Sequence, residues 1–248
     1  MKKYVASSDT VFDLGMNNGD DTEYYIKKGY RVVAVEANPS LCEHARIKFE
    51  QAIKLHRLFI HNVAVWTEYG RRSFFVNQKN DHWSSLDPGW ARRDDTSCHE
   101  IVMDCVPLSH LIALHGVPLY LKIDIEGVDE LVVRQLQGQE YLPLYVSMED
   151  CRFGYEYMKA LNDLGYTDFK LLDQGGLGSL TDASIGHRFR LGSSGPFGED
   201  IPGPWLSYED VLSEYSRRVR DRNGIRVAPC SSWWDIHCRA NTKTSHLI

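Results

Sequence analysis

The sequence predicts an α/β fold, a doubly wound, Rossmann-like sheet with a long lid-like insertion before its last strand. Two observations carry this prediction. Apolar, β-branched runs typical of buried parallel strands alternate with helical patterns as far as residue 172. A stretch rich in glycine and proline then interrupts the alternation before a last strand-like run, WWDIHCR, at 233–239. Since 43 % of the 248 residues are hydrophobic, we expect one domain over residues 1–248.

The predicted elements start with VFDLGMNNGDDTEYYIKKGYRVVAVEANP at 11–39, which combines strand, glycine turn, helix and strand. Its helix has acidic residues in the first turn and Gly29 as a C-terminal stop. Apolar runs predict strands at 10–14, 31–36, 62–66, 72–76, 100–106, 119–125, 144–148, 168–172 and 233–239. Amphipathic patterns predict helices at 20–28, 39–51, 129–137, 155–164 and 207–222, and a short helix capped by Ser109. The polar run at 78–97 is expected to be a surface loop.

Composition disfavours several classes of protein. The formal net charge is −6, whereas proteins that bind nucleic acid are usually basic. The first residues, MKKYVASSD, do not resemble a signal peptide, and no apolar run is long enough to span a membrane. The six cysteines form no CxxC pair and are expected to be reduced thiols. These observations favour a cytoplasmic protein.

The glycine turn indicates which nucleotide the opening unit holds. A dinucleotide site usually carries GxGxxG, but here Asn17 stands at the second glycine position and the pattern is DxGxxxG. This form is typical of proteins that bind S-adenosylmethionine (SAM), which has no pyrophosphate to place on a helix N-terminus. Gly15 and Gly19 would allow close backbone approach to its amino-acid end, and Asp13 can accept a hydrogen bond from its ammonium group.

Glu36 ends the second strand, 21 residues after Gly15. A carboxylate at this position can accept hydrogen bonds from both hydroxyls of a ribose. SAM and NAD both contain a ribose, so Glu36 alone leaves an NAD-linked oxidoreductase open. The missing GxGxxG pattern counts against that alternative.

A second acidic strand end lies in LYLKIDIEGVDE at 119–130. Asp124 and Glu126 follow a buried strand, and ligands of open α/β sheets bind beyond the carboxyl ends of the strands. Lys122 shares a face with them and can neutralise a carboxylate there. Glu149 and Asp150 end a later strand in the same way. Such carboxylates could hold Mg²⁺ or sugar hydroxyls, and we do not favour an obligatory metal, because methyl transfer from a sulfonium does not require one.

Several of these stretches resemble the FkbM family of SAM-dependent methyltransferases. The matching pieces are VFDLGMNNGDDT, VVAVEANP, NVAV, LKIDIEGVDELVV and VSMED, in this order over most of residues 11–150. The resemblance implies a class I SAM-methyltransferase fold and methylation of a hydroxyl on a natural product or a carbohydrate. It also implies that the methionine end of SAM is lined by Asp13, Gly15, Asn17, Gly19 and Thr22. Glu36 would bind the ribose, and the residues near ribose and adenine would be Ala37, Asn38, Asn62 and Ala64.

Methylation of a hydroxyl needs a group that takes up its proton. The candidates are Asp124, Glu126, His82, His187 and His237. A carboxylate close to the sulfonium would stabilise the positive charge that methyl transfer removes, so we expect the base on the acceptor side. Asp124 and Glu126 at the strand end and His187 in the insertion are therefore the expected catalytic residues.

The insertion at 174–232 is expected to act as a lid that binds the acceptor. Its start is rich in glycine and can hinge, and its middle is rich in proline. Phe197, Trp205 and Trp233 could stack on a sugar ring, which favours a sugar or glycan as acceptor. A secondary-metabolite hydroxyl and a non-catalytic subunit that only binds SAM remain as alternatives.

Overall fold

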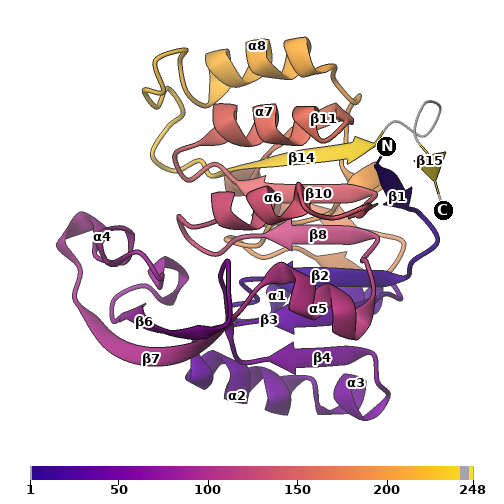
Figure 1. The fold of residues 1–248 in the computed structure, drawn as a ribbon. Coiled ribbons are helices and arrows are strands. Elements are labelled where there is room, and N and C mark those ends of the chain that lie inside the picture. The colour runs from indigo at the N-terminus through magenta and orange to yellow at the C-terminus, as the bar shows by residue number, and fades with distance from the viewer. Residues whose placement is uncertain (1, 241–245, 248) are drawn as a thin grey trace.

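The computed structural model describes residues 2–240 and 246–247, and a seven-stranded sheet forms its centre (Figure 1). In order across the sheet, the strands are β11 (Tyr166–Asp173), β14 (Trp234–Ala240), β10 (Tyr145–Glu149), β8 (Tyr120–Ile123), β2 (Thr10–Leu14), β3 (Arg31–Val35) and β4 (Leu58–His61). β14 is antiparallel to both of its neighbours, and the other six strands run in one direction. The chain order reverses between β2 and β8, which is where open α/β sheets bind ligands. This is the class I SAM-methyltransferase arrangement, so the predicted fold class is confirmed.

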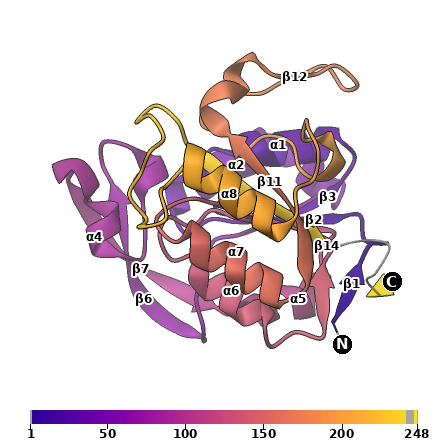
Figure 2. The same ribbon diagram turned by 90° about the horizontal axis from the view of Figure 1, so that it is seen from above.

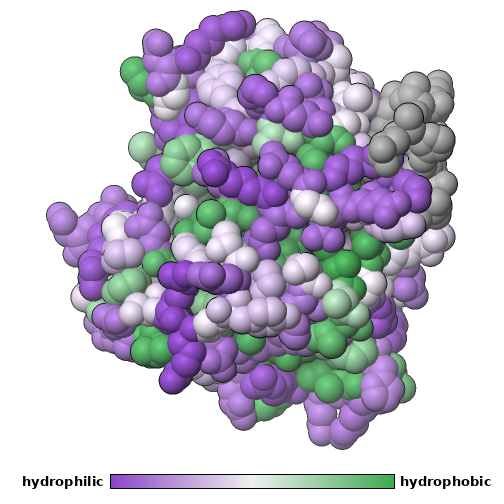
Figure 3. Space-filling view, viewed as in Figure 1, coloured by the Kyte–Doolittle hydropathy of each residue, from purple (hydrophilic) through white to green (hydrophobic). Residues whose placement is uncertain are grey.

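Helices cover both faces of the sheet (Figure 2). One face carries α1 (Asp20–Lys27) and α2 (Pro39–Lys48), and the other carries α5 (Leu108–His115), α6 (Glu130–Leu136), α7 (Gly154–Asp163) and α8 (Tyr208–Arg218). Alternate residues of a strand face opposite sides, so Val11 packs in the core under α1 and Phe12 in the core under α5 to α8. The outer surface of the α5–α7 face mixes hydrophilic and hydrophobic residues (Figure 3). Within the described residues, no helix has the length and apolar character needed to cross a bilayer.

A smaller sheet projects beyond the carboxyl ends of the central strands (Figure 1). It contains β5 (Ala64–Val65), β7 (Cys98–Val106) and β6 (Gly70–Asn77), and β6 pairs antiparallel with β7 over its whole length. Residues 78–97 connect β6 to β7 through three short helices, which are η1 (Asp81–Trp83), α4 (Pro88–Ala91) and η2 (Arg93–Asp95). We call residues 78–97 the cap segment, because they lie beside the cleft described below.

The insertion wraps around the edge strand β11 and contributes to both cores. Its first part holds η3 (Gln174–Ser179), β12 (Thr181–Asp182), β13 (His187–Arg188) and η4 (Gly198–Asp200). Phe197 is 5 % exposed and stacks on Tyr120 of β8, with ring centroids 4.0 Å apart. Leu206 pairs with Phe169 of β11, and α8 then packs in the core on the opposite face. Much of this stretch is therefore a structural part of the domain.

The structure differs from the predicted elements at several places. It adds β4 and two short strands, β1 (Lys3–Val5) and β9 (Tyr141–Pro143), which pair with each other. The predicted strand at 62–66 is reduced to β5, and the predicted helix at 39–51 is divided at Phe49 into α2 and α3 (Glu50–Lys54). Ser109 does not cap α5, because that helix starts at Leu108 and Pro107 is its N-cap residue. Short strands are set by their partners, so single-sequence patterns identify them poorly.

The buried stacking of Phe197 makes the insertion testable as part of the core. We expect Phe197→Ala to lower the free energy of unfolding by about 3–5 kcal/mol, because it removes a buried aromatic ring and leaves a cavity. Leu191→Ala in the same insertion should change it by about 0.5 kcal/mol or less, since Leu191 is 66 % exposed. Urea denaturation followed by circular dichroism measures both. Equal stability of the two variants would show that the insertion does not belong to the core.

Candidate functional site

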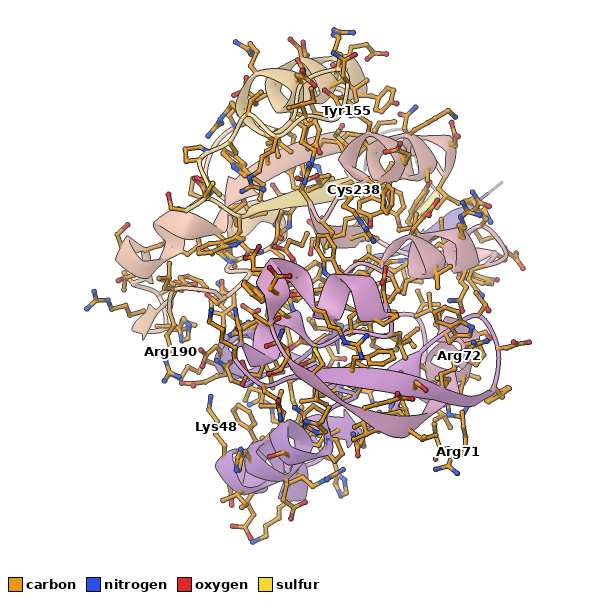
Figure 4. All side chains as sticks on the ribbon, turned by 90° about the vertical axis from the view of Figure 1, so that its left-hand side faces the viewer. Lys48, Arg71, Arg72, Tyr155, Arg190 and Cys238 are labelled. Carbon is orange, nitrogen blue, oxygen red and sulfur yellow. The ribbon has the colours of Figure 1, made fainter. Side chains whose placement is uncertain are left out.

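A cleft of about 600 Å³, counted with its part open to solvent, lies at the switch point between β2 and β8. Figure 4 shows the molecule from the side that lies on the left in Figure 1, where the smaller sheet projects. The cleft is lined by Gly15, Asn17, Val35, Glu36, Ala37, Val63, Ala64, Val65, Phe74, Asp81, His82, Ser84, Leu86, Asp124, Ile125, Glu126 and Val128. These residues come from the carboxyl ends of central strands, from the smaller sheet and from the cap segment.

The Gly15 turn is fixed by the neighbouring backbone. The amides of Gly15 and Met16 both donate to the carbonyl of Val35, at 2.9 and 3.0 Å. Gly15 has φ +85°, and a Cβ atom there would lie 1.7 Å from the carbonyl oxygen of Asp124. Only glycine fits between the two strand ends, so this residue brings the β2 turn and the β8 turn together at the cleft.

Glu36 lies at the base of the cleft with its carboxylate bound by backbone amides. Its Oε2 accepts from the amide of Asn17 at 2.9 Å, and its Oε1 accepts from the amide of Asn38 at 2.7 Å. Burial raises the pKa of Glu36 to about 7, although these two amides oppose the shift. The carboxylate is held at the position where the sequence predicts a ribose acceptor.

The ammonium group of Lys122 joins three carboxylates beneath the turn. Its Nζ lies 3.2 Å from Oδ1 of Asp13, 3.4 Å from Oδ2 of Asp124 and 3.7 Å from Oδ2 of Asp21. It also donates to the carbonyl of Gly15 at 3.2 Å. Burial lowers the pKa of Lys122, but the three carboxylates outweigh burial and raise it well above its ordinary value. Lys122 is therefore charged and neutralises part of the acidic cluster.

Asp21 connects this cluster to the insertion. Its carboxylate accepts from the amides of Ser194, at 2.9 and 3.0 Å, and Gly195, at 3.2 Å. Burial raises the pKa of Asp21 to about 6, and Lys122 opposes the shift. Next to it, Asp20 accepts from Arg190 at 2.6 Å and from Lys48 at 3.4 Å, and Figure 4 labels both cations on this side of the molecule. The start of α1 thus anchors residues 190–195.

The structure brings only part of the predicted cofactor set to the cleft. The predicted residues that line it are Gly15, Asn17, Glu36, Ala37 and Ala64. The others support these: Thr22 donates to Asp13, Asn62 donates to the carbonyls of Glu36 and Ala37, and Asn38 caps α2. Gly19 has φ +78°, and a Cβ atom there would lie 2.6 Å from the Phe49 ring. Asp13 is fully buried, with one oxygen bound to Lys122 and the other to Thr22.

The opposite wall of the cleft contains residues that the sequence patterns did not single out. Asp81, Ser84 and Leu86 come from the cap segment, whereas Phe74 of β6 packs with Ala37 and Ala64. The polar composition of residues 78–97 does not indicate this role. Their position after a predicted strand was an available signal, because ligands of open α/β sheets bind beyond strand ends. His82, one of the candidate bases, lies on the same wall, with Nε2 4.0 Å from Asp81.

Two of the three expected catalytic residues line the cleft. Asp124 lies beside Lys122, and Glu126 accepts from Trp90 Nε1 and Arg93 Nη2, both at 2.8 Å. Burial, with Asp124 next in effect, raises the pKa of Glu126 to about 8. His187 lies outside the cleft lining, because its ring is buried against Tyr24 and Phe189. Burial lowers the pKa of His187, which suits a neutral packing residue.

Other predicted acceptor residues also lie elsewhere. Phe197 is in the core, and Trp205 packs against Tyr145 at the start of β10, away from the carboxyl edge. Asp150 turns away from the cleft, where Tyr215 and Arg220 donate to its two oxygens. His237 is buried in β14, and burial lowers its pKa to about 3.

One group of possible metal ligands lies near the cleft. Ligand atoms of Glu126, Glu149 and Cys151 lie within 4.8 Å of one another. The guanidinium of Arg93 already contacts Glu126, so a cation would have to displace it. Apart from this contact, the observation is a cluster of acidic side chains and a thiol, which by itself does not establish a metal site. We therefore assign no metal to it.

The fold and the cleft define a class I SAM methyltransferase. The sheet has the order of that class, and the glycine turn and a strand-end glutamate meet at its switch point. A family model described as "Methyltransferase FkbM domain" matches residues 13–167, more than half of the chain. The chain therefore belongs to the FkbM methyltransferase family, whose members are SAM-dependent. No curated protein sequence matched the chain.

Solved structures with similar folds include several methyltransferases. FkbM from Methylobacillus flagellatus KT is 14 % identical with a TM-score of 0.43, and the match covers 67 % of this chain but 40 % of that one. Precorrin-6y C5,15-methyltransferase from Geobacter metallireducens GS-15 is 8 % identical with a TM-score of 0.43, covering 97 % and 82 %. The O-methyltransferase TomG from Streptomyces achromogenes, solved with SAM, is 8 % identical with a TM-score of 0.40, covering 95 % and 75 %. These likenesses say nothing about the substrate of this chain.

The raised pKa of Glu36 predicts pH-dependent cofactor binding. If ionised Glu36 accepts the ribose hydroxyls, the affinity for S-adenosylhomocysteine should rise about tenfold from pH 6 to pH 8, because the carboxyl loses its proton around pH 7. Glu36→Gln should remove this dependence. Calorimetry at pH 6, 7 and 8 measures it, with Glu43→Gln as control, since Glu43 is 72 % exposed on α2. A wild-type slope in Glu36→Gln would exclude this role.

Removal of Lys122 should be strongly destabilising. Lys122→Met would leave Asp13, Asp21 and Asp124 without their shared cation, and we expect a loss of about 3–5 kcal/mol in the free energy of unfolding. Chemical denaturation tests this, with Lys159→Met as control because Lys159 is 68 % exposed. A loss as small as that of the control would mean that the cluster does not depend on Lys122.

Proposed function

We propose that this chain transfers the methyl group of SAM to a hydroxyl of a neutral, polyhydroxylated acceptor such as a sugar or a glycan end. One observation carries the proposal. A single cleft combines a wall suited to an adenosyl group with a wall that is polar, acidic and free of lysine and arginine among the described residues. We propose that the whole chain acts as one methyltransferase domain, with residues 190–195 of the insertion beside the cleft.

The first wall has the chemistry that an adenosyl group requires. Glu36 offers carboxylate oxygens to a ribose, and Ala37, Val63, Ala64 and Phe74 offer apolar surface to a purine ring. Gly15 and Asn17 of the turn line the cleft and would lie beside the amino-acid end. When bound, SAM supplies an electrophilic methyl group on a sulfonium. The residues of this wall bind and orient it.

The charge of the lining favours a neutral acceptor. Glu36, Asp81, Asp124 and Glu126 line the cleft, and His82 is the only other titratable group in that lining. Carboxylates accept hydrogen bonds from hydroxyls and repel phosphate or carboxylate groups. An acceptor with several hydroxyls and no negative charge therefore fits this wall best.

His82 is best placed to take up the proton of the acceptor hydroxyl. Asp124 is paired with Lys122 and Glu126 with Arg93, whereas the nearest carboxylate to His82 lies 4.0 Å away. A neutral imidazole nitrogen can act as a general base for such a proton transfer. As the acceptor oxygen forms its bond to the methyl carbon, the carbon–sulfur bond breaks and the hydroxyl proton passes to His82. The products are a methyl ether and S-adenosylhomocysteine.

A secondary-metabolite hydroxyl is a second candidate acceptor. The apolar side chains of Leu86, Ile125 and Val128 also line the cleft and could contact a hydrocarbon skeleton. The hydroxyl chemistry and the proton acceptor are the same in both cases. A subunit that binds SAM without transfer is the remaining alternative, and it predicts cofactor binding with no turnover of any acceptor.

Transfer of a labelled methyl group tests the proposal. We expect SAM to methylate neutral glycosides, such as methyl α-D-mannopyranoside or methyl α-L-rhamnopyranoside, roughly tenfold or more faster than glucose 6-phosphate. His82→Gln should lower turnover by roughly 10²–10⁴-fold, because it removes the proton acceptor, and should leave S-adenosylhomocysteine affinity unchanged. His44→Gln, on the exposed surface of α2, is the control. Preference for the phosphorylated sugar, or full turnover in His82→Gln, would refute the corresponding part.

A further inference from the structure

We propose that Glu126 is a positioning residue that holds the cap segment on the cleft and thereby places His82 and Asp81 beside the acceptor. This inference rests on the proposed function only for the identity of the molecules that the cleft binds. The attachment itself is a property of the described contacts, and it can be measured without an acceptor.

Three side chains of the cap segment end at Glu126. Trp90 Nε1 and Arg93 Nη2 donate to its Oε2, each at 2.8 Å. Ser85 Oγ donates to its backbone carbonyl at 2.6 Å. These donors lie at positions 85, 90 and 93 of the segment, so a single residue beyond β8 fixes the segment at several points.

The next residue provides a seat for the indole ring. Gly127 has φ +87°, and a Cβ atom there would lie 2.8 Å from Trp90 Cγ. The guanidinium groups of Arg93 and Arg152 both lie over the Trp90 ring, each with its Cζ atom 4.6 Å from the ring centroid. Arg152 also contacts Asp87 at 3.1 Å, which ties the segment to the turn after β10. The segment is thus packed on two strand ends.

The backbone of Glu126 supports a positioning role. Its φ of +58° is uncommon for a residue with a side chain, and such a conformation persists where surrounding contacts determine it. The oxygen that accepts from Trp90 and Arg93 is occupied by two donors, one of them charged. Glu126 therefore acts through the segment, although it lines the cleft.

The same segment carries the polar acceptor wall. Asp81, His82, Ser84 and Leu86 line the cleft, and the segment's only described strand pairing joins Ser85 to Phe75 of β6. If Glu126 releases Trp90 and Arg93, the segment loses two of its three hydrogen bonds to Glu126, while the Glu36 wall keeps its own contacts. The acceptor wall should therefore loosen without loss of the cofactor wall.

Hydrogen exchange measured by mass spectrometry tests this attachment directly. We expect Arg93→Gln and Glu126→Gln to speed exchange in residues 78–97 by about 10- to 100-fold, because each removes a charge-assisted hydrogen bond. Trp90→Phe keeps the ring on Gly127 and loses the N–H, so it should give a smaller increase. Arg92→Gln is the matched control, since Arg92 is exposed and lies over the Phe75 ring rather than at Glu126.

Several outcomes decide the inference. The double variant Arg93→Gln/Glu126→Gln should exchange no faster than Glu126→Gln alone, because both residues act through one contact. S-adenosylhomocysteine affinity, measured by calorimetry, should change less than about threefold in these variants, and the acceptor KM of the methyl mannoside assay should rise more than kcat falls. Exchange equal to that of Arg92→Gln would overturn the inference. Loss of kcat in Glu126→Gln without faster exchange would instead make Glu126 a catalytic residue, and lack of methyl transfer by the wild type would affect only the proposed function.

Discussion

The buried ammonium of Lys122 is the interaction on which the rest of the site depends. It lies between β2 and β8 and contacts Asp13 of one strand and Asp124 beyond the end of the other. A carboxylate buried without a partner would lose its charge or destabilise the fold. The same Lys122 ammonium also donates to the Gly15 carbonyl. It therefore fixes the Gly15 turn, on one wall of the cleft, relative to Asp124 at the other strand end.

This cluster also connects the cleft to the far part of the chain. Asp21 shares its carboxylate between Lys122 and the amides of Ser194 and Gly195. A Cβ atom at Gly192 would lie 3.8 Å from His82 Cε1, so the anchored loop reaches the cap segment. The insertion thus has two functions in the fold. Phe197 and α8 complete the cores, and the short stretch at 190–195 reaches the cap segment at Gly192.

Local patterns predicted the parts of the site that depend on short spacing. The Gly15 turn, Glu36 and Asp124 follow from strand ends and glycine positions, and all three line the cleft. Long-range packing decides the remainder. Nothing near His187 in the sequence shows that Tyr24 and Phe189 bury it, and Asp150 turns away because Arg220, 70 residues later, pairs with it. Likewise, the polar run at 78–97 becomes a wall of the cleft through contacts with Glu126 and Gly127 that its own sequence does not show.

The pairing of the carboxylates resolves an apparent conflict in the cleft. Methyl transfer removes positive charge from the sulfonium, and an unpaired carboxylate beside it would favour the ground state over the transition state. Here the Lys122 ammonium lies 3.4 Å from Asp124 and the Arg93 guanidinium lies 2.8 Å from Glu126. Their oxygens still provide hydrogen-bond acceptors for hydroxyls, but their field at the methyl group is reduced. In the proposed function, such a lining would accept hydrogen bonds from a polyol without opposing the loss of the methyl group, and proton uptake would be left to His82 on the other wall.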